Sequence, residues 1–129
     1  MHKPLSPASI HPPFSRYSLG VEVSSRSRYV FCSGQVGIAA DGSVPADCAG
    51  QARVCFDNIA AVLAEAGMGF GDVVKLNAFV TGREHLAEYM AVRNELFPEP
   101  YPASTLMIVT GFARPEFVVE IEAIAAIPS

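Results

Sequence analysis

The feature that most restricts the fold is a strand-like stretch at residues 73–80 that lies between two stretches with helical spacing. From Val74 to Val80, apolar side chains occupy every second position, which is the period of a strand with one buried face. On either side, apolar residues recur at intervals of three and four, which predicts amphipathic helices over residues 47–66 and 81–97. Because a strand, a helix and a second strand favour a parallel arrangement with a right-handed crossover, these stretches predict helices packed on a partly parallel sheet.

Both predicted helices have end signals in the sequence. Asp47 is a candidate N-cap of the first helix, since its carboxylate can accept a hydrogen bond from a free backbone N–H group, and Gly67 suits the position just past the end. Thr81 and Glu84 have the spacing of a capping box at the start of the second helix, which ends before Pro98. The two helices are therefore expected to be separate elements joined through the strand.

Two pairs of β-rich segments flank this central unit. Residues 20–23 and 28–33 have a polar turn between them, and residues 104–110 and 117–127 are separated by a glycine-containing turn, so each pair predicts an antiparallel hairpin. The predicted order is β-β-α-β-α-β-β in an α+β protein, with a mixed sheet and both helices on one face. The other face would lack a cover, which favours packing against copies of the same chain.

The distribution of charge and apolar residues excludes some functions. The net charge is −4, and residues 31–129 hold five cations against twelve acids. An acidic body disfavours binding that depends on neutralising phosphates, so we do not expect a nucleic-acid partner. No stretch approaches the roughly 18 apolar residues of a membrane span, and the N-terminus lacks the apolar core of a secretory signal. We expect a cytoplasmic protein with no membrane association.

The chain length and the cysteines bear on domain organisation and metal binding. A length of 129 residues suits one domain, and four prolines within residues 1–16 disfavour a helix there. We therefore predict an extended arm at residues 1–16 and a single domain at residues 17–129. The three cysteines form neither an even disulfide set nor a paired zinc motif, and no two histidines have metal-ligand spacing. Reduced thiols and no metal are the expectation.

Several short segments, taken in order, resemble those of one protein family. They are Arg16-Tyr17, Gly20-Val21, Ser33 to Val36, Gln51 with Asp57 to Ile59, Asp72 to Lys75, Pro102-Ala103 and Val119 to Ala125. In order and spacing they are similar to the Rid family, the reactive-intermediate deaminases also called the YjgF family. The resemblance implies a chorismate-mutase-like fold, a homotrimer with a central barrel of sheets, and pockets between subunits. It also implies hydrolysis of enamines and imines, such as 2-aminoacrylate, to a carbonyl compound and ammonia without a cofactor.

The resemblance also implies a set of site residues. Tyr17 matches a pocket tyrosine, and Ser33 with Gly34 matches a strand-end pair that lines the cleft. Glu120 matches the glutamate that handles the attacking water. Each has a plainer explanation as well: an aromatic that anchors the arm, turn chemistry, and a solvated strand face. Glu122 lies on the same strand face, about 6.6–6.8 Å along, but the resemblance gives a role only to Glu120.

The chain departs from the deaminating members of that family at the substrate clamp. Their Pro-Ala-Arg-Ser segment is Pro102 to Thr105 here, so Ser104 replaces an arginine that binds the substrate carboxylate. Leu106 replaces a cysteine, and Met90 replaces an asparagine on the second helix. Because charged hydrogen bonds contribute about 1.5–3 kcal/mol each, we expect weaker binding of a simple carboxylate. The cations that remain as candidates are each expected to be solvated surface charges: Arg16, Arg93 and Arg114.

Three functions stay open at this point. The first is hydrolysis of a small imine or enamine that differs from 2-aminoacrylate or is held by a different anchor. The second is a non-catalytic trimer that binds a small molecule, which the apolar Met90 and Leu106 would suit. The third is the endoribonuclease activity attributed to some relatives, which the acidic body argues against. Imine hydrolysis in a cleft between subunits is the leading prediction.

Overall fold

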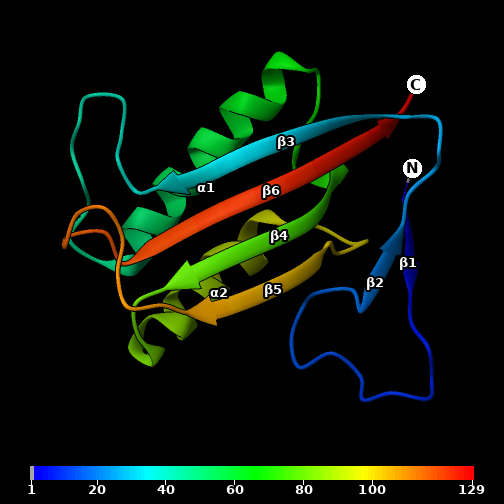
Figure 1. Ribbon diagram of the computed structural model, residues 1–129, viewed down its shortest axis with the longest axis horizontal. Coiled ribbons are helices and arrows are strands. Elements are labelled where there is room, and N and C mark those ends of the chain that lie inside the picture. The colour runs from blue at the N-terminus through cyan, green and yellow to red at the C-terminus, as the bar shows by residue number, and fades with distance from the viewer. Residues whose placement is uncertain (1) are drawn as a thin grey trace.

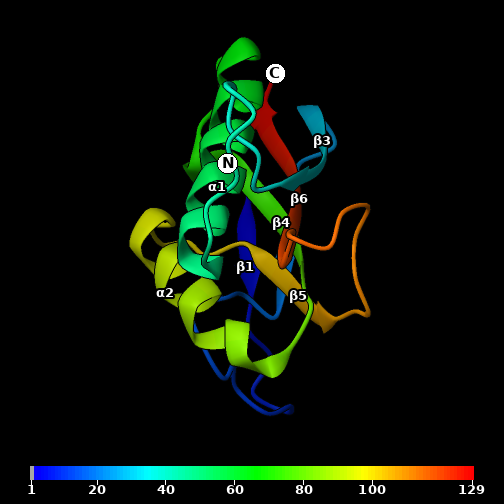
Figure 2. The ribbon, with the colours of Figure 1, turned by 90° about the vertical axis from the view of Figure 1, so that its left-hand side faces the viewer.

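A computed structural model describes residues 2–129 and places two helices on one face of a mixed four-stranded sheet (Figures 1 and 2). The elements of these two layers are β3 (Ser27–Val36), α1 (Cys48–Glu65), β4 (Val73–Val80), α2 (Leu86–Leu96), β5 (Ala103–Ile108) and β6 (Val119–Pro128). The strand order is β3-β6-β4-β5, with β6 antiparallel to both neighbours and β5 parallel to β4. The predicted α+β fold, with a mixed sheet and both helices on one face, is confirmed.

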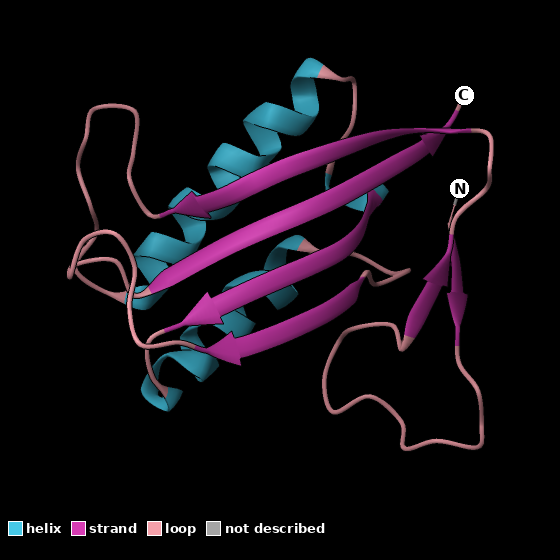
Figure 3. Ribbon diagram, viewed as in Figure 1, coloured by secondary structure: helices cyan, strands magenta, loops and turns pink. Residues whose placement is uncertain are grey.

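The strand pairings differ from the two hairpins that the sequence predicts. Strand β2 (Gly20–Glu22) pairs with β1 (Lys3–Leu5) in a separate antiparallel pair and not with β3 (Figure 3). Strand β6 lies between β3 and β4, so β5 and β6 are not neighbours. Burial accounts for the central place of β6, because an inner strand removes more apolar surface from water than an edge strand. Four of its helix-facing side chains are at most 3% exposed: Val119, Ile121, Ala123 and Ala125.

The ends of the helices match most of their sequence signals. The Asp47 side chain caps α1 by accepting a hydrogen bond from the backbone N–H of Gly50 at 2.9 Å. Gly67 follows the end of α1 with a φ of +72°, a conformation in which most side chains would be strained. The predicted start of the second helix at Thr81 is wrong, because the chain first makes a 3₁₀ turn, η2 (Arg83–His85). Neither helix of residues 2–129 is long and apolar enough to cross a membrane.

The core lies between the helices and the sheet. Phe56 of α1 stacks on Tyr89 of α2, with 6.2 Å between the ring centroids, and meets Phe97 at a steep angle at 5.3 Å. Burying a large apolar side chain contributes roughly 1.5–3 kcal/mol. This aromatic cluster therefore holds the two helices together and against the strands.

The face of the sheet opposite the helices is uncovered and partly apolar. Phe31 on β3 is 73% exposed, and Tyr29 stacks beside it with ring centroids 6.3 Å apart. Met107 on β5 is 52% exposed. We term this the open face, with Tyr29, Phe31 and Met107 as its exposed apolar residues. Tyr29 and Phe31 lie together on one edge strand, and Met107 lies on the other edge strand. Because exposed apolar patches usually mark interfaces, the open face is a candidate surface for contact with another chain.

We expect the folded chain to lose stability as the pH rises above 9. Burial raises the pKa of Cys48 to about 11, the pKa of Cys55 to about 12 and the pKa of Tyr89 to about 12. Between the ordinary and the raised pKa of each group, only the unfolded chain loses the proton, which favours unfolding by up to about 1.4 kcal/mol per pH unit and group. Urea unfolding midpoints measured from pH 8 to pH 11 should therefore fall, and fall less steeply in Cys48→Ala. A constant midpoint in the unaltered chain would contradict this expectation.

Candidate functional site

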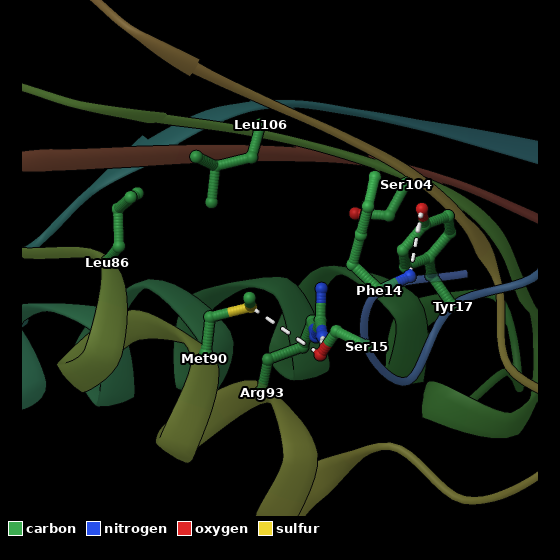
Figure 4. Close-up of a pocket in the computed structure, with 8 residues that line it drawn as sticks. All are labelled: Phe14, Ser15, Tyr17, Leu86, Met90, Arg93, Ser104 and Leu106. Atoms are coloured by element: carbon green, nitrogen blue, oxygen red, sulfur yellow. Dashed lines mark hydrogen bonds between the residues drawn. The ribbon is translucent and has the colours of Figure 1, made fainter. Parts of the chain in front are cut away.

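A pocket of about 290 Å³ opens beside β5, between that strand, α2 and the loop that precedes β2 (Figure 4). Four of its lining residues are those that the sequence resemblance singles out: Tyr17, Met90, Ser104 and Leu106. The other four were not expected there: Phe14, Ser15, Leu86 and Arg93. The fold thus brings together side chains that lie far apart in the sequence.

The register of β5 explains why Ser104 and Leu106 reach this pocket. They lie opposite Leu76 and Ala78 of β4, which are fully buried beneath the helices. Residues directly opposite one another on neighbouring strands lie on the same face of the sheet, so Ser104 and Leu106 lie on the helix side. Because β5 is the edge of this sheet, α2 and the loop form the remaining walls.

The loop that carries Tyr17 is tied to the residues that lead into β5. The backbone N–H of Ser18 donates to the carbonyl of Pro102 at 3.0 Å, and the Ser18 hydroxyl donates to the carbonyl of Tyr101. The Tyr17 hydroxyl oxygen accepts a hydrogen bond from the backbone N–H of Phe14 at 3.4 Å. These bonds hold Tyr17 at the pocket wall and leave its own hydroxyl proton free to be donated.

Arg93 is the charged member of the pocket lining, and it is buried. Only 3% of its surface is exposed, and its guanidinium carbon lies 5.9 Å from the centroid of the Tyr89 ring. Nη2 donates to Ser15 Oγ at 2.8 Å and to Asn94 Oδ1 at 3.1 Å. Nε is buried without a partner. The expectation that Arg93 is a solvated surface charge is therefore wrong.

The spacing of residues along α2 indicates that Arg93 is buried. Arg93 follows Tyr89 by four positions and Met90 by three, so the helical period places it on the inward face. Charge alone is a poor guide, because arginine buries its stem and even its planar head where stacking and hydrogen bonds satisfy it. Arg16 and Arg114 are exposed, as expected, and Arg114 pairs with Glu116 at 3.3 Å.

Ser33, Gly34 and Glu120 lie away from this pocket. The pairing of β3 with β6 shifts its register between Cys32 and Gln35, so Ser33 and Gly34 occupy a bulge. A side chain at position 34 would collide with the carboxylate of Glu120, so the glycine leaves space for that group. The predicted strand-end pair and the predicted glutamate are therefore neighbours.

Glu120 and Glu122 share one face of the sheet but differ in their partners. They lie opposite Phe79 and Asn77 of β4, respectively. Asn77 Nδ2 donates to Glu122 Oε2 at 3.2 Å. Within residues 2–129, the side chain of Glu120 has neither a hydrogen-bond donor nor an ion-pair partner. Glu120 is therefore the carboxylate that is free to act on a bound molecule.

The sheet separates the two groups of predicted site residues. Val119 and Ile121 are fully buried on the helix side, so Glu120 between them projects from the open face. Ser104 and the rest of the pocket lie on the helix side of β5. A single chain does not place Glu120 beside Tyr17, so a site that uses both must include a second chain.

Cys32 directly precedes the bulge on β3, and its side chain is buried. Burial raises the pKa of Cys32, which contacts the carbonyl oxygen of Ser33 through Sγ at 3.6 Å. A raised pKa lowers the fraction of reactive thiolate. Among residues 2–129, no group of three or more His, Cys, Asp or Glu side chains could hold a metal ion.

Comparisons with known proteins give consistent matches along nearly the whole chain. Residues 8–127 match the family model described as endoribonuclease L-PSP. The chain is 39% identical to the RutC family protein YjgH of Escherichia coli strain K12, over 95% of this chain and 92% of that protein. It is 35% identical to the 2-iminobutanoate/2-iminopropanoate deaminase of the same strain, over 93% of this chain and 91% of that protein. The crystal structure of a Rid family protein of unknown function, YyfB from Yersinia pestis, matches with a TM-score of 0.86 at 29% identity, over 98% of each chain.

Proposed function

Because the chain belongs to the Rid family, also called the YjgF family, we propose that it hydrolyses a small imine or enamine to a carbonyl compound and ammonia. The observation that carries this proposal is the 35% identity, over 93% of the chain, to a protein named 2-iminobutanoate/2-iminopropanoate deaminase. Two features of the fold support it. Glu120 offers a carboxylate without a protein partner among residues 2–129, and the pocket beside β5 offers about 290 Å³ for a small substrate.

The reaction needs only water and positioned proton carriers. Glu120 takes a proton from a water whose oxygen bonds to the imine carbon, while the π electrons of the C=N bond move to nitrogen, which takes up a proton. In the resulting carbinolamine the nitrogen takes up the proton that Glu120 holds, and the hydroxyl proton passes to the group that first protonated the nitrogen. The C–N bond then breaks with its electron pair going to nitrogen, which releases ammonia and leaves the carbonyl group. An enamine first takes a proton on carbon and becomes the iminium ion, which is the imine with its nitrogen protonated. The free hydroxyl proton of Tyr17 is a donor for the substrate nitrogen or oxygen.

We further propose that a second copy of the chain completes the site, in a homotrimer as the family resemblance implies. The support is the division of the site residues between two faces of one sheet: Tyr17 and Ser104 line the pocket, whereas Glu120 projects from the open face. The exposed Phe31 and Met107 make that face apolar enough to be an interface. Substrate would then bind between the pocket of one subunit and the Glu120 carboxylate of the next.

Following imine decay tests the proposed reaction directly. An amino-acid oxidase generates 2-imino acids and an amine oxidase generates imines without a carboxylate, and each decays spontaneously in water. We expect the purified protein to accelerate the decay of at least one of them in proportion to protein concentration, with release of ammonia. Protein unfolded by heat is the control. No acceleration of either class by the folded oligomer would refute the hydrolase.

A non-catalytic binding protein is the second candidate, and the pocket lining favours it to some degree. Leu86, Met90 and Leu106 make much of the wall apolar, which suits binding more than acid–base chemistry. A small molecule that stabilises the oligomer and is recovered unchanged, without any imine turnover, would support this role. The endoribonuclease activity named in the family description is disfavoured by the net charge of −4.

A further inference from the structure

We infer that Arg93 on α2 binds the carboxylate of this pocket's substrate. It would take over the role of the strand arginine that Ser104 replaces in this chain. The inference deepens the proposed function and rests on it for the nature of the substrate. The substrate class is the one for which the deaminase relative is named, the imine of a short, apolar 2-oxo acid, and the new element is the role of Arg93. The carboxylate would bind the guanidinium on the α2 side, and the alkyl chain would contact the apolar wall.

The contacts of Arg93 do not balance its charge. A buried charge is costly unless an opposite charge or a full set of hydrogen bonds accompanies it. Arg93 is 3% exposed, and the ion pairs of residues 2–129 are Arg53 with Glu95 and Arg114 with Glu116. The groups that contact the Arg93 guanidinium are neutral: a hydroxyl, an amide oxygen and an aromatic ring. A bound anion would supply the missing charge.

The Arg93 guanidinium also has N–H donors that no group of the described chain uses. A guanidinium has five N–H groups, and the hydrogen bonds found for Arg93 both come from Nη2. Nε is buried and has no partner. Ser15 and Asn94 take up both N–H groups of Nη2, so the N–H groups of Nε and Nη1 are the ones left to donate charge-assisted hydrogen bonds to a carboxylate. In Figure 4 the guanidinium extends from α2 towards the pocket wall that Ser104 forms.

Ser15 holds the guanidinium in this position. Its Oγ accepts from Arg93 Nη2 at 2.8 Å and donates to Met90 Sδ at 3.7 Å. The guanidinium carbon also lies 5.9 Å from the centroid of the Tyr89 ring, within the range of a cation–π contact. Because the side chain is already ordered, binding an anion would cost little additional conformational entropy.

The remaining lining selects a small carboxylate over a phosphate. The pocket presents one cation, and much of the surface around it is apolar: Leu86, Met90 and Leu106. Phosphate sites combine several donors, such as a helix N-terminus or more than one cation, to hold a group of higher charge. At about 30 Å³ per water, 290 Å³ holds roughly ten waters, which is space for a short-chain acid. A monoanion with an apolar tail fits these properties.

The experiment compares Arg93→Met with a matched control, Arg53→Met, whose arginine lies on the exposed side of α1 and pairs with Glu95 at 2.6 Å. Substrates are 2-iminobutanoate and the imine of butanone, in which a methyl group replaces the carboxylate. We expect Arg93→Met to raise KM for 2-iminobutanoate about tenfold or more, with a smaller change in kcat and little change for the butanone imine. Arg93→Lys should retain part of the preference, and Arg53→Met should retain all of it.

Ligand binding separates this inference from the proposed reaction. The probes are 2-oxobutanoate, butanone and inorganic phosphate, each measured by its effect on the thermal unfolding of the unaltered protein and of Arg93→Met. Stabilisation by 2-oxobutanoate that Arg93→Met removes would support the anchor even if no imine is hydrolysed. Hydrolysis of 2-iminobutanoate with an unchanged KM in folded Arg93→Met would overturn the anchor and leave the hydrolase standing.

Two further outcomes would also decide whether Arg93 binds a carboxylate. If Arg93→Met does not fold, the unaltered protein decides: stabilisation by 2-oxobutanoate but not by butanone supports the anchor, and equal stabilisation or none overturns it. Stronger stabilisation by inorganic phosphate than by 2-oxobutanoate would overturn the assignment to a carboxylate.

Discussion

Replacing Glu120 with glutamine is expected to lower kcat for imine hydrolysis by about 10²–10⁴-fold, which is the usual contribution of a general base. The amide has the same shape as the carboxylate but cannot take a proton from water. Glu120 lies against Gly34, and no donor among residues 2–129 occupies its oxygens, so its carboxylate is available to a bound water. The measurement is the steady-state rate of decay of an imine that the unaltered protein hydrolyses.

Glu122→Gln is the matched control for that variant. Glu122 lies two positions further along the same face of β6, where Asn77 donates a hydrogen bond to it. An amide at this position can still accept that bond, so we expect turnover within a few-fold of the unaltered rate. Light scattering should show the same oligomer for both variants. Full turnover by an intact Glu120→Gln oligomer would rule out Glu120 as the base.

Phe31→Glu is expected to dissociate the oligomer into single chains of 13.7 kDa and to abolish turnover together with it. Phe31 is 73% exposed on the open face and stacks beside Tyr29. In an interface, a buried and unpaired carboxylate would cost several kcal/mol, whereas in the free chain the glutamate is solvated. Turnover should be lost because the pocket and the Glu120 carboxylate would then belong to separate molecules. Sedimentation velocity at micromolar concentration measures the mass.

Val62→Glu tests whether any added charge has the same effect. Val62 is 40% exposed, but it lies on α1, on the other side of the sheet. We expect this variant to keep the mass and the activity of the unaltered protein. A single-chain mass for the unaltered protein, or an unchanged mass for Phe31→Glu, would contradict an interface on the open face.

Local patterns predicted the elements better than their pairing. Asp47 and Gly67 mark the two ends of α1, because caps act through hydrogen bonds and backbone angles within one turn of the chain. The hairpin predictions failed because the choice of a partner strand depends on distant segments. Strands β6 and β4 both bury their helix-facing side chains, and they pair with each other at the centre of the sheet, so β6 lies between β3 and β4 and not beside β5, which precedes it in the chain.

Some residues of the candidate site could be identified from the sequence, and others only from the fold. Resemblance to the Rid family picked out Tyr17, Met90, Ser104 and Leu106, which the fold gathers around one pocket. It did not pick out Arg93, because the residue type suggested a solvated cation while only the helical spacing suggested burial. The sequence also could not predict that Glu120 lies away from the pocket, because this depends on the face of the sheet on which each residue lies.

The sequence by itself determined the family, the α+β class, and the presence of one helix before and one helix after β4 in the chain. These depend on residue identity and on periodicity along the chain. The tertiary structure alone decided the order of the strands, the burial of Arg93 and the placement of Glu120 on the open face. The physical reason is that burial and strand pairing are set by contacts between segments far apart in the chain. A local pattern states which side of an element is apolar, but only the packed fold states what lies against it.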